Sequence, residues 1–171
     1  MGKLKIKRIM WTLFFFLVIG QVQFIYAENK QPTKNEIFTF LQEAFVAQLS
    51  LAEKYRTQQE VSEILSPFFT EEYQLLFTKE HLFLEPEGVI MYGTDIPDYF
   101  IPFYSYNDNT KLLTTLDKII VYEYFLPQLE GSIIWDQPHY QILTITKTTS
   151  GWQISDYEIS EAKPEENASN D

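Results

Sequence analysis

The order of apolar and polar residues divides the chain into a helical part and a β part. Over residues 34–56 apolar side chains recur at the i, i+3, i+4, i+7 spacing of an amphipathic helix, with glutamine, glutamate and lysine largely off that stripe. Thr33 and Glu36 form a capping-box pattern at the start of this stretch. The spacing therefore predicts one long helix over residues 34–56.

Two shorter helices are expected next. Thr57 and Glu60 repeat the capping-box pattern, and the apolar residues after them predict a short helix. That helix stops at Pro67, because proline lacks the amide hydrogen that a helix interior needs. Thr70 is the expected N-cap of a third helix, from about Glu71 to Lys79.

Beyond the turn residues at 85–88 the pattern changes to short apolar and aromatic runs typical of strands. We expect strands at residues 89–92, 99–104, 112–116, 119–126, 140–147 and 152–159. Small polar residues and a glycine at 148–151 predict a hairpin loop between the last two. The run 119–126 is mostly apolar on both alternating faces, with Glu123 as the exception, which predicts a central strand covered on both sides.

These elements predict an α+β fold, with three N-terminal helices, one long and two short, packed on a curved antiparallel sheet. The chain has 171 residues, 45% of them hydrophobic, which is enough for one domain. It contains no cysteine, so disulfides, thiolate nucleophiles and sulfur-based zinc sites are excluded.

The N-terminus has the pattern of a secretory signal peptide. Four basic residues within the first eight precede an apolar run over residues 9–19, and the small residue Ala27 marks the expected cleavage site. The alternative is an uncleaved segment that anchors the protein in the membrane. In either case the domain is expected outside the cytoplasm, secreted or in the cell envelope.

We therefore expect a signal peptide at 1–27, a flexible leader at 28–33, a single domain at 34–159 and a disordered acidic tail at 160–171, which has no large apolar side chain. Residues 28–171 carry 9 basic and 24 acidic side chains. So acidic a chain argues against nucleic acid as a partner, because phosphate binding needs clustered lysine and arginine. No stable membrane insertion is expected after cleavage.

The order of elements resembles the cone-shaped α+β fold of the nuclear transport factor 2-like superfamily. More narrowly, the segments Gly93-Thr94-Asp95, 99–103, 121–125 and Gly151-Trp152 resemble a family of small exported proteins of unknown function in bacilli, and the resemblance extends over about residues 35–158. It implies a Gram-positive, extracytoplasmic protein and no particular activity. The wider superfamily includes enzymes as well as binding and dimerisation modules, so fold analogy does not decide the function.

Catalytic members of that superfamily usually place a carboxylate, often with histidine or tyrosine, inside the cone. The local cluster that matches is an aspartate pair with neighbouring tyrosines. The candidate ligand-binding residues are Tyr92, Asp95, Asp98, Tyr99, Tyr104 and Tyr122. The simpler interpretation, which we favour, is that the aspartates cap a turn around Pro97. Tyrosines in this number would also suit a pocket for a glycan or an apolar ligand.

No metal site and no cofactor are expected. His81 is placed at the end of the third predicted helix, where a partial positive charge suits the exposed carbonyl groups, and His139 at the start of a strand. Neither is paired with a nucleophile or with a second ligand at helical spacing. The oxygen-rich Asn107-Asp108-Asn109 lacks the calcium-loop spacing and is interpreted as a turn.

The favoured hypothesis is a non-enzymatic module that binds a small ligand or an envelope protein, with a homodimer through the sheet as an expectation by fold analogy. A first alternative is a small isomerase, dehydratase or hydrolase that uses an aspartate with a tyrosine in the cone. A second alternative is an envelope-anchored structural accessory protein, which requires the N-terminal segment to be retained.

Overall fold

The structure, a computed structural model, describes residues 31–93, 98–131 and 133–165. The predicted signal peptide, Asp95 and the end of the predicted tail lie outside these ranges. All helices and strands below belong to Lys34–Asp171, one of the two units into which the chain divides. Within the described ranges, no helix is long and apolar enough to cross a membrane.

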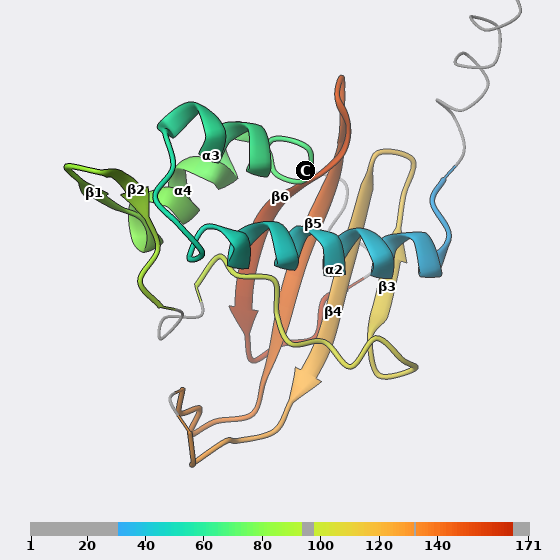
Figure 1. The fold of residues 1–171 in the computed structure, drawn as a ribbon. Helices are drawn as coiled ribbons and strands as arrows, with labels where there is room; N and C mark the ends of the chain where they lie inside the picture. Colours follow the sequence, from blue (N-terminus) through green and yellow to red (C-terminus); the bar gives the residue numbers. More distant parts are fainter. Residues whose placement is uncertain (1–30, 94–97, 132, 166–171) are drawn as a thin grey trace, which may run out of the picture. The chain divides into compact units, whose positions relative to one another are not determined.

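Three helices precede two antiparallel sheets, which confirms the predicted α+β class (Figure 1). The helices are α2 (Lys34–Ser50), α3 (Gln58–Leu65) and α4 (Glu71–His81). The strands are β1 (Phe83–Glu85), β2 (Gly88–Ile90), β3 (Lys111–Thr114), β4 (Lys118–Phe125), β5 (His139–Thr148) and β6 (Gly151–Ser160). β1 and β2 form a separate hairpin, and the other four strands form an open sheet in the order β3-β4-β5-β6.

The core lies between α2 and one face of the four-stranded sheet. Figure 1 shows α2 running across the front of that sheet. Ile37, Leu41 and Ala44 are spaced along one side of α2 and are buried, and so are Val121 of β4 and Leu143 of β5, which are paired across the two strands. Burial of each of the larger side chains, those of isoleucine, leucine and valine, contributes about 1.5–3 kcal/mol, so this layer supplies much of the stability.

The prediction that the first helix continues to residue 56 was wrong, because α2 ends at Ser50. Beyond it, the backbone of Arg56 exchanges two hydrogen bonds with Val89 of β2, at 2.8 and 2.9 Å. The Arg56 guanidinium also donates to the Ser50 carbonyl at 2.9 Å, one of the acceptors left free at a helix end. Pairing with a distant strand thus outweighs the apolar periodicity of residues 51–55.

β1 was not predicted. It pairs with β2 around the turn at residues 85–88, which was predicted. Gly88 has φ of +136°, and a side chain there would place its Cβ 2.7 Å from the Arg56 carbonyl oxygen. Glycine is therefore required at the point where the hairpin approaches Arg56, in the connection between α2 and α3.

The prediction of a strand at residues 99–104 was also wrong. This segment has no ladder partner and lies against the helices instead, fixed by side chains. The fully buried carboxamide of Gln48 donates to the Tyr99 carbonyl at 2.7 Å and accepts from the Ile101 amide at 3.0 Å. The Tyr73 hydroxyl donates to the same Tyr99 carbonyl at 3.0 Å. Side chains from α2 and α4 therefore replace the missing strand partner.

The continuation of this segment is fixed to the sheet in the same way. The buried carboxylate of Glu123 on β4 accepts from the Ser105 amide at 2.9 Å and from the Thr110 hydroxyl at 2.7 Å. The Tyr104 hydroxyl lies 3.1 Å from two sheet carbonyl oxygens, those of Val121 and Gln141. Glu123, the polar exception in an apolar strand, is thus an anchor for the segment.

β4 lies between β3 and β5, as expected of a central strand. Its residues from Ile119 to Glu123 are buried or half-buried, but Tyr124 is 49% exposed. The strand is therefore covered on both sides except near its end. Residues 107–109 form the predicted turn, in which the Asn107 side chain accepts from the Asn109 amide at 2.7 Å.

The outer edge of β6 is covered by the connection between α3 and α4. The Ile154 amide donates to the Phe68 carbonyl at 2.8 Å, and the Thr70 amide donates to the Ile154 carbonyl at 3.0 Å. Thr70 is also the N-cap of α4, as predicted, and accepts from the Tyr73 amide. The start of α4 is thus attached to the main sheet.

Replacing Gln48 by leucine should lower the free energy of unfolding by about 1–3 kcal/mol, because the buried Ile101 amide loses its acceptor while Tyr99 keeps the Tyr73 hydroxyl. Urea denaturation measures this change. Gln42→Leu, on the exposed side of the same helix, is the control and should change stability by less than about 0.5 kcal/mol. Equal effects of the two substitutions would contradict the role given to Gln48.

Candidate functional site

Three of the candidate residues from the sequence lie in the irregular segment that begins at Asp98. Tyr99 adopts a left-handed conformation, with φ of 63°, and its ring packs against those of Tyr73 and Tyr157. Asp98 precedes it and accepts a hydrogen bond from His81 through its backbone oxygen. Tyr104 follows and is buried against the sheet. In this part of the molecule the tyrosines act as internal packing and hydrogen-bonding groups.

The other candidate residues lie elsewhere. Tyr92 is 59% exposed, its ring packs against Phe83, and its hydroxyl lies 3.5 Å from that of Tyr55. Tyr122 alternates with Glu123 along β4 and is therefore on the opposite face of the sheet from the core. Asp95 lies outside the described residues. The described candidates thus do not line one common site.

His81 is the last residue of α4, as predicted, but its side chain is buried. Its Nε2 lies 2.6 Å from the Asp98 carbonyl oxygen, and its ring packs against Phe77 and Phe100. The aromatic neighbours explain the burial, and the hydrogen bond satisfies the ring nitrogen. His81 therefore helps to hold the irregular segment that begins at Asp98.

A buried polar group on the sheet was missed by sequence reasoning. His139 Nδ1 lies 3.1 Å from the Gln137 carbonyl oxygen, and its Nε2 lies 3.0 Å from the side-chain nitrogen of Gln141. Both ring nitrogens of this buried histidine therefore have hydrogen-bond partners. Gln141 is paired with Glu123 across the two central strands, which places these polar side chains together on the core face. Among the described residues, no group of histidine, aspartate and glutamate has the arrangement of a metal site.

Burial changes the acid–base properties of the internal tyrosines. It raises the pKa of Tyr73 and Tyr104 well above the usual value. Burial, and then the nearby charge of Glu123, raise the pKa of Tyr106 to about 12. Burial also raises the pKa of Tyr157, and the nearby charge of Asp98 raises it further. The Tyr157 hydroxyl has no hydrogen-bond partner within the described ranges. These hydroxyl groups are neutral throughout the physiological range.

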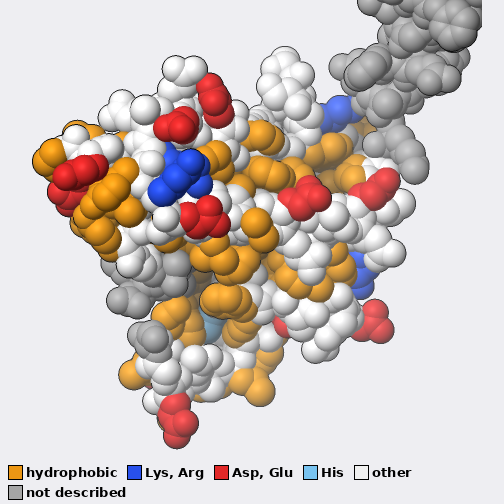
Figure 2. Space-filling model, in the orientation of Figure 1, with side chains coloured by type: hydrophobic (Ala, Val, Ile, Leu, Met, Phe, Trp, Pro, Cys, Tyr) orange, Lys and Arg blue, Asp and Glu red, His pale blue; other side chains and the backbone are white. Residues whose placement is uncertain are grey.

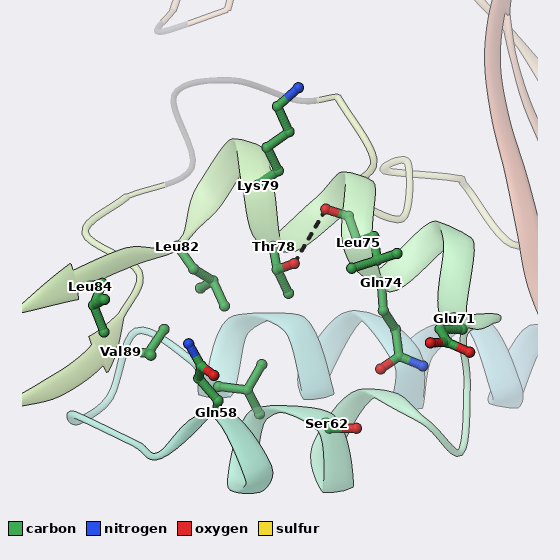
Figure 3. A pocket seen from close by; sticks show the side chains of 11 residues that line it. Gln58, Ser62, Glu71, Gln74, Leu75, Thr78, Lys79, Leu82, Leu84 and Val89 are labelled. Atoms are coloured by element: carbon green, nitrogen blue, oxygen red, sulfur yellow. Dashed lines mark hydrogen bonds between the residues drawn. The ribbon is translucent and has the colours of Figure 1, made fainter.

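A surface groove lies between α3, α4 and the β1–β2 hairpin, with a volume of about 640 Å³ (Figure 3). α3 and α4 form its two long walls, and the hairpin closes one end. The apolar lining residues are Val61, Leu75, Leu82, Leu84 and Val89. The polar lining residues are Gln58, Ser62, Glu71, Gln74, Thr78 and Lys79. The groove has the apolar lining and polar rim of a binding surface.

Two leucines of this groove are left in solvent. Leu75 on α4 is 63% exposed and Leu84 on β1 is 75% exposed, whereas Val61 and Val89 are buried beneath them. In Figure 2, hydrophobic and acidic side chains lie next to one another at the left of the view, where Figure 1 places β1 and β2. Exposed apolar side chains that border a groove are typical of interaction sites.

A second, smaller groove of about 330 Å³ lies between α2 and the irregular segment. Phe45 and Phe103 pack edge to face there, with ring centroids 5.5 Å apart, and Val46 is exposed beside them. Its volume is about half that of the groove between α3 and α4. The larger groove is therefore the main candidate functional site.

Fold and groove define the class of protein, an α+β domain with an apolar surface groove. Residues 33–125, more than half of the chain, match the family described as "protein of unknown function (DUF3993)", and the chain belongs to this family. The matched residues extend from the start of α2 to the end of β4 and include the whole groove. The comparisons with curated proteins and with solved structures found no match.

The internal tyrosines should make the protein unstable in alkali. Unfolded tyrosines ionise near pH 10, whereas Tyr104 and Tyr106 keep their protons to higher pH in the folded state, so stability is lost as pH rises above about 10. The loss is at most about 1.4 kcal/mol per pH unit for each retained proton. Urea denaturation at a series of pH values, with tyrosinate absorbance followed in parallel, measures it.

Two substitutions distinguish the contribution of an internal tyrosine to this pH dependence from that of a surface tyrosine. Tyr104→Phe should reduce the pH dependence of stability above about pH 10, whatever it does at neutral pH. Tyr124→Phe, at the exposed end of β4, should leave that dependence unchanged. If the stability of the unchanged protein did not fall above about pH 10, the conclusion that its internal tyrosines keep their protons in the folded state would be wrong.

Proposed function

We propose that this protein is a non-enzymatic binding module that holds an apolar segment of a partner in the groove between α3, α4 and the β1–β2 hairpin. The observation that carries the proposal is the exposure of Leu75 on the α4 wall and of Leu84 on the hairpin that closes one end of the same groove. Covering them with an apolar partner removes aliphatic surface from water, which gains about 25 cal/mol for each Å².

The proposal places the module outside the cytoplasm, secreted or in the cell envelope. Its support is the sequence of residues 1–27, with a basic start, an apolar run and Ala27 before the acidic part of the chain. The absence of cysteine is compatible with export from a Gram-positive cell, where a fold can rely on its core alone. The order of three helices followed by an antiparallel sheet supports a relationship to the nuclear transport factor 2-like fold.

Export is tested by the mass of the protein recovered from the medium or envelope of cells that express the full chain. We expect a chain that begins at Glu28, because signal peptidase prefers a small residue such as Ala27 before the cleaved bond. An intact N-terminus in the membrane fraction would instead support the anchored accessory protein. Retention in the cytoplasm would contradict export altogether.

Binding in the groove is tested with a neutral amphipathic peptide of about 14 residues, built from leucine at helical spacing, glutamine and alanine. We expect the exported protein to bind it with a negative heat-capacity change, the signature of apolar burial. Replacing both Leu75 and Leu84 by serine should abolish binding without unfolding the protein, since both side chains are exposed. Calorimetric titration gives the affinity and the heat capacity.

The matched control replaces Leu116 and Leu129 by serine. These leucines are 86% and 69% exposed but lie outside the groove. The control variant should bind the peptide as well as the unchanged protein does. Equal binding by all three proteins would show that the groove is not the site.

A further inference from the structure

The surface around the groove is strongly acidic. Residues 57–90, which contain α3, α4 and the hairpin, carry seven glutamates and one lysine. The glutamates are Glu60, Glu63, Glu71, Glu72, Glu80, Glu85 and Glu87. None of them forms an ion pair with another residue in the described part of the chain. The charge of this region is therefore available to a partner.

Two of these glutamates lie at one end of the groove. Glu71 lines the groove, and Glu72 follows it in the first turn of α4. Lys79 borders the groove, but Figure 3 shows its ammonium group pointing away from α3. Carboxylates within about 8 Å of a bound charge are only partly screened at physiological salt. A partner with positive charges beside its apolar side chains is favoured.

The same charges disfavour other occupants. A second copy of this chain brings the same acidic surface, so self-association through the groove is opposed by like charges. Anionic lipid surfaces and phosphate polymers are opposed for the same reason. The partner is therefore expected to be a different protein, of opposite charge.

The walls of the groove favour a helix as the bound segment. α3 and α4 lie on either side of it, the apolar residues Val61 and Leu75 come from these two helices, and Leu82 directly follows α4. A third helix can insert its own row of aliphatic side chains between two such walls, with anchors at i, i+3, i+4 and i+7. Residues on the flanks of that helix then lie beside the glutamates.

We propose that the natural ligand of the groove is a basic amphipathic helix of another protein, with aliphatic side chains in the groove and lysine or arginine beside the glutamates. This inference rests on the proposed function and adds the chemistry of the partner. Electrostatic complementarity of this kind increases the association rate and selects the partner, while the apolar contacts hold it.

The test compares three synthetic helices with the same leucine positions, of about 14 residues each. Their remaining positions are alanine with lysine, with glutamine or with glutamate. The lysine helix should bind the exported protein at least about tenfold more tightly than the glutamine helix at low salt, and raising the salt should reduce that advantage. The glutamate helix should bind most weakly.

A charge variant tests where the preference arises. Replacing Glu71 and Glu72 by glutamine should remove much of the advantage of the lysine helix and leave binding of the glutamine helix unchanged. The matched control replaces two other exposed acidic residues, Glu130 and Glu158, and removes the same total charge. It should keep most of that advantage, because these residues lie in the β4–β5 loop and on β6.

The outcomes separate this inference from the function on which it rests. Equal binding of the lysine and glutamine helices, lost in both cases when Leu75 and Leu84 become serine, would overturn the basic partner and keep the groove as a binding site. Lysine-helix binding that survives those serine substitutions would overturn the inference, because the charge preference would then lie elsewhere. Binding of none of the three helices would overturn both proposals.

Discussion

The fold depends on a segment that has no secondary structure of its own. The chain from Asp98 to Thr110 lies between the helices and the sheet, and buried side chains satisfy its backbone: Gln48 from α2, Tyr73 from α4 and Glu123 from β4. A buried backbone group without a partner costs about 1–3 kcal/mol. Helices and sheet are therefore connected through this segment by hydrogen bonds as well as by apolar packing.

Local elements were predictable because their signals are local. The capping box of Thr57 and Glu60 has the expected reciprocal hydrogen bonds, which lower the pKa of Glu60. The β5–β6 hairpin turns where predicted, with Gly151 at φ of +111°. Each of these features is set by residues within a few positions of one another, which a sequence pattern can reveal.

The errors arose where distant residues decide the structure. The aromatic run 99–104 has strand-like composition, but its partner Gln48 is about 50 residues earlier, and nothing in the pattern connects the two. The groove escaped prediction for the same reason, since Leu75 and Leu84 belong to different elements whose packing no local rule supplies. Both leucines fit the composition of their elements, so only the fold shows that they share a surface. Glu123 alone carried a visible signal, as a carboxylate in an apolar strand.

The attachment of the α3–α4 connection to β6 has a consequence for recognition. Two backbone hydrogen bonds of Ile154, one donated by its amide and one accepted by its carbonyl, hold the end of one groove wall and the start of the other against the edge strand β6. The two walls cannot separate at that end without breaking these bonds. The groove is thus preorganised, and a ligand that fits it need not supply the free energy of opening it.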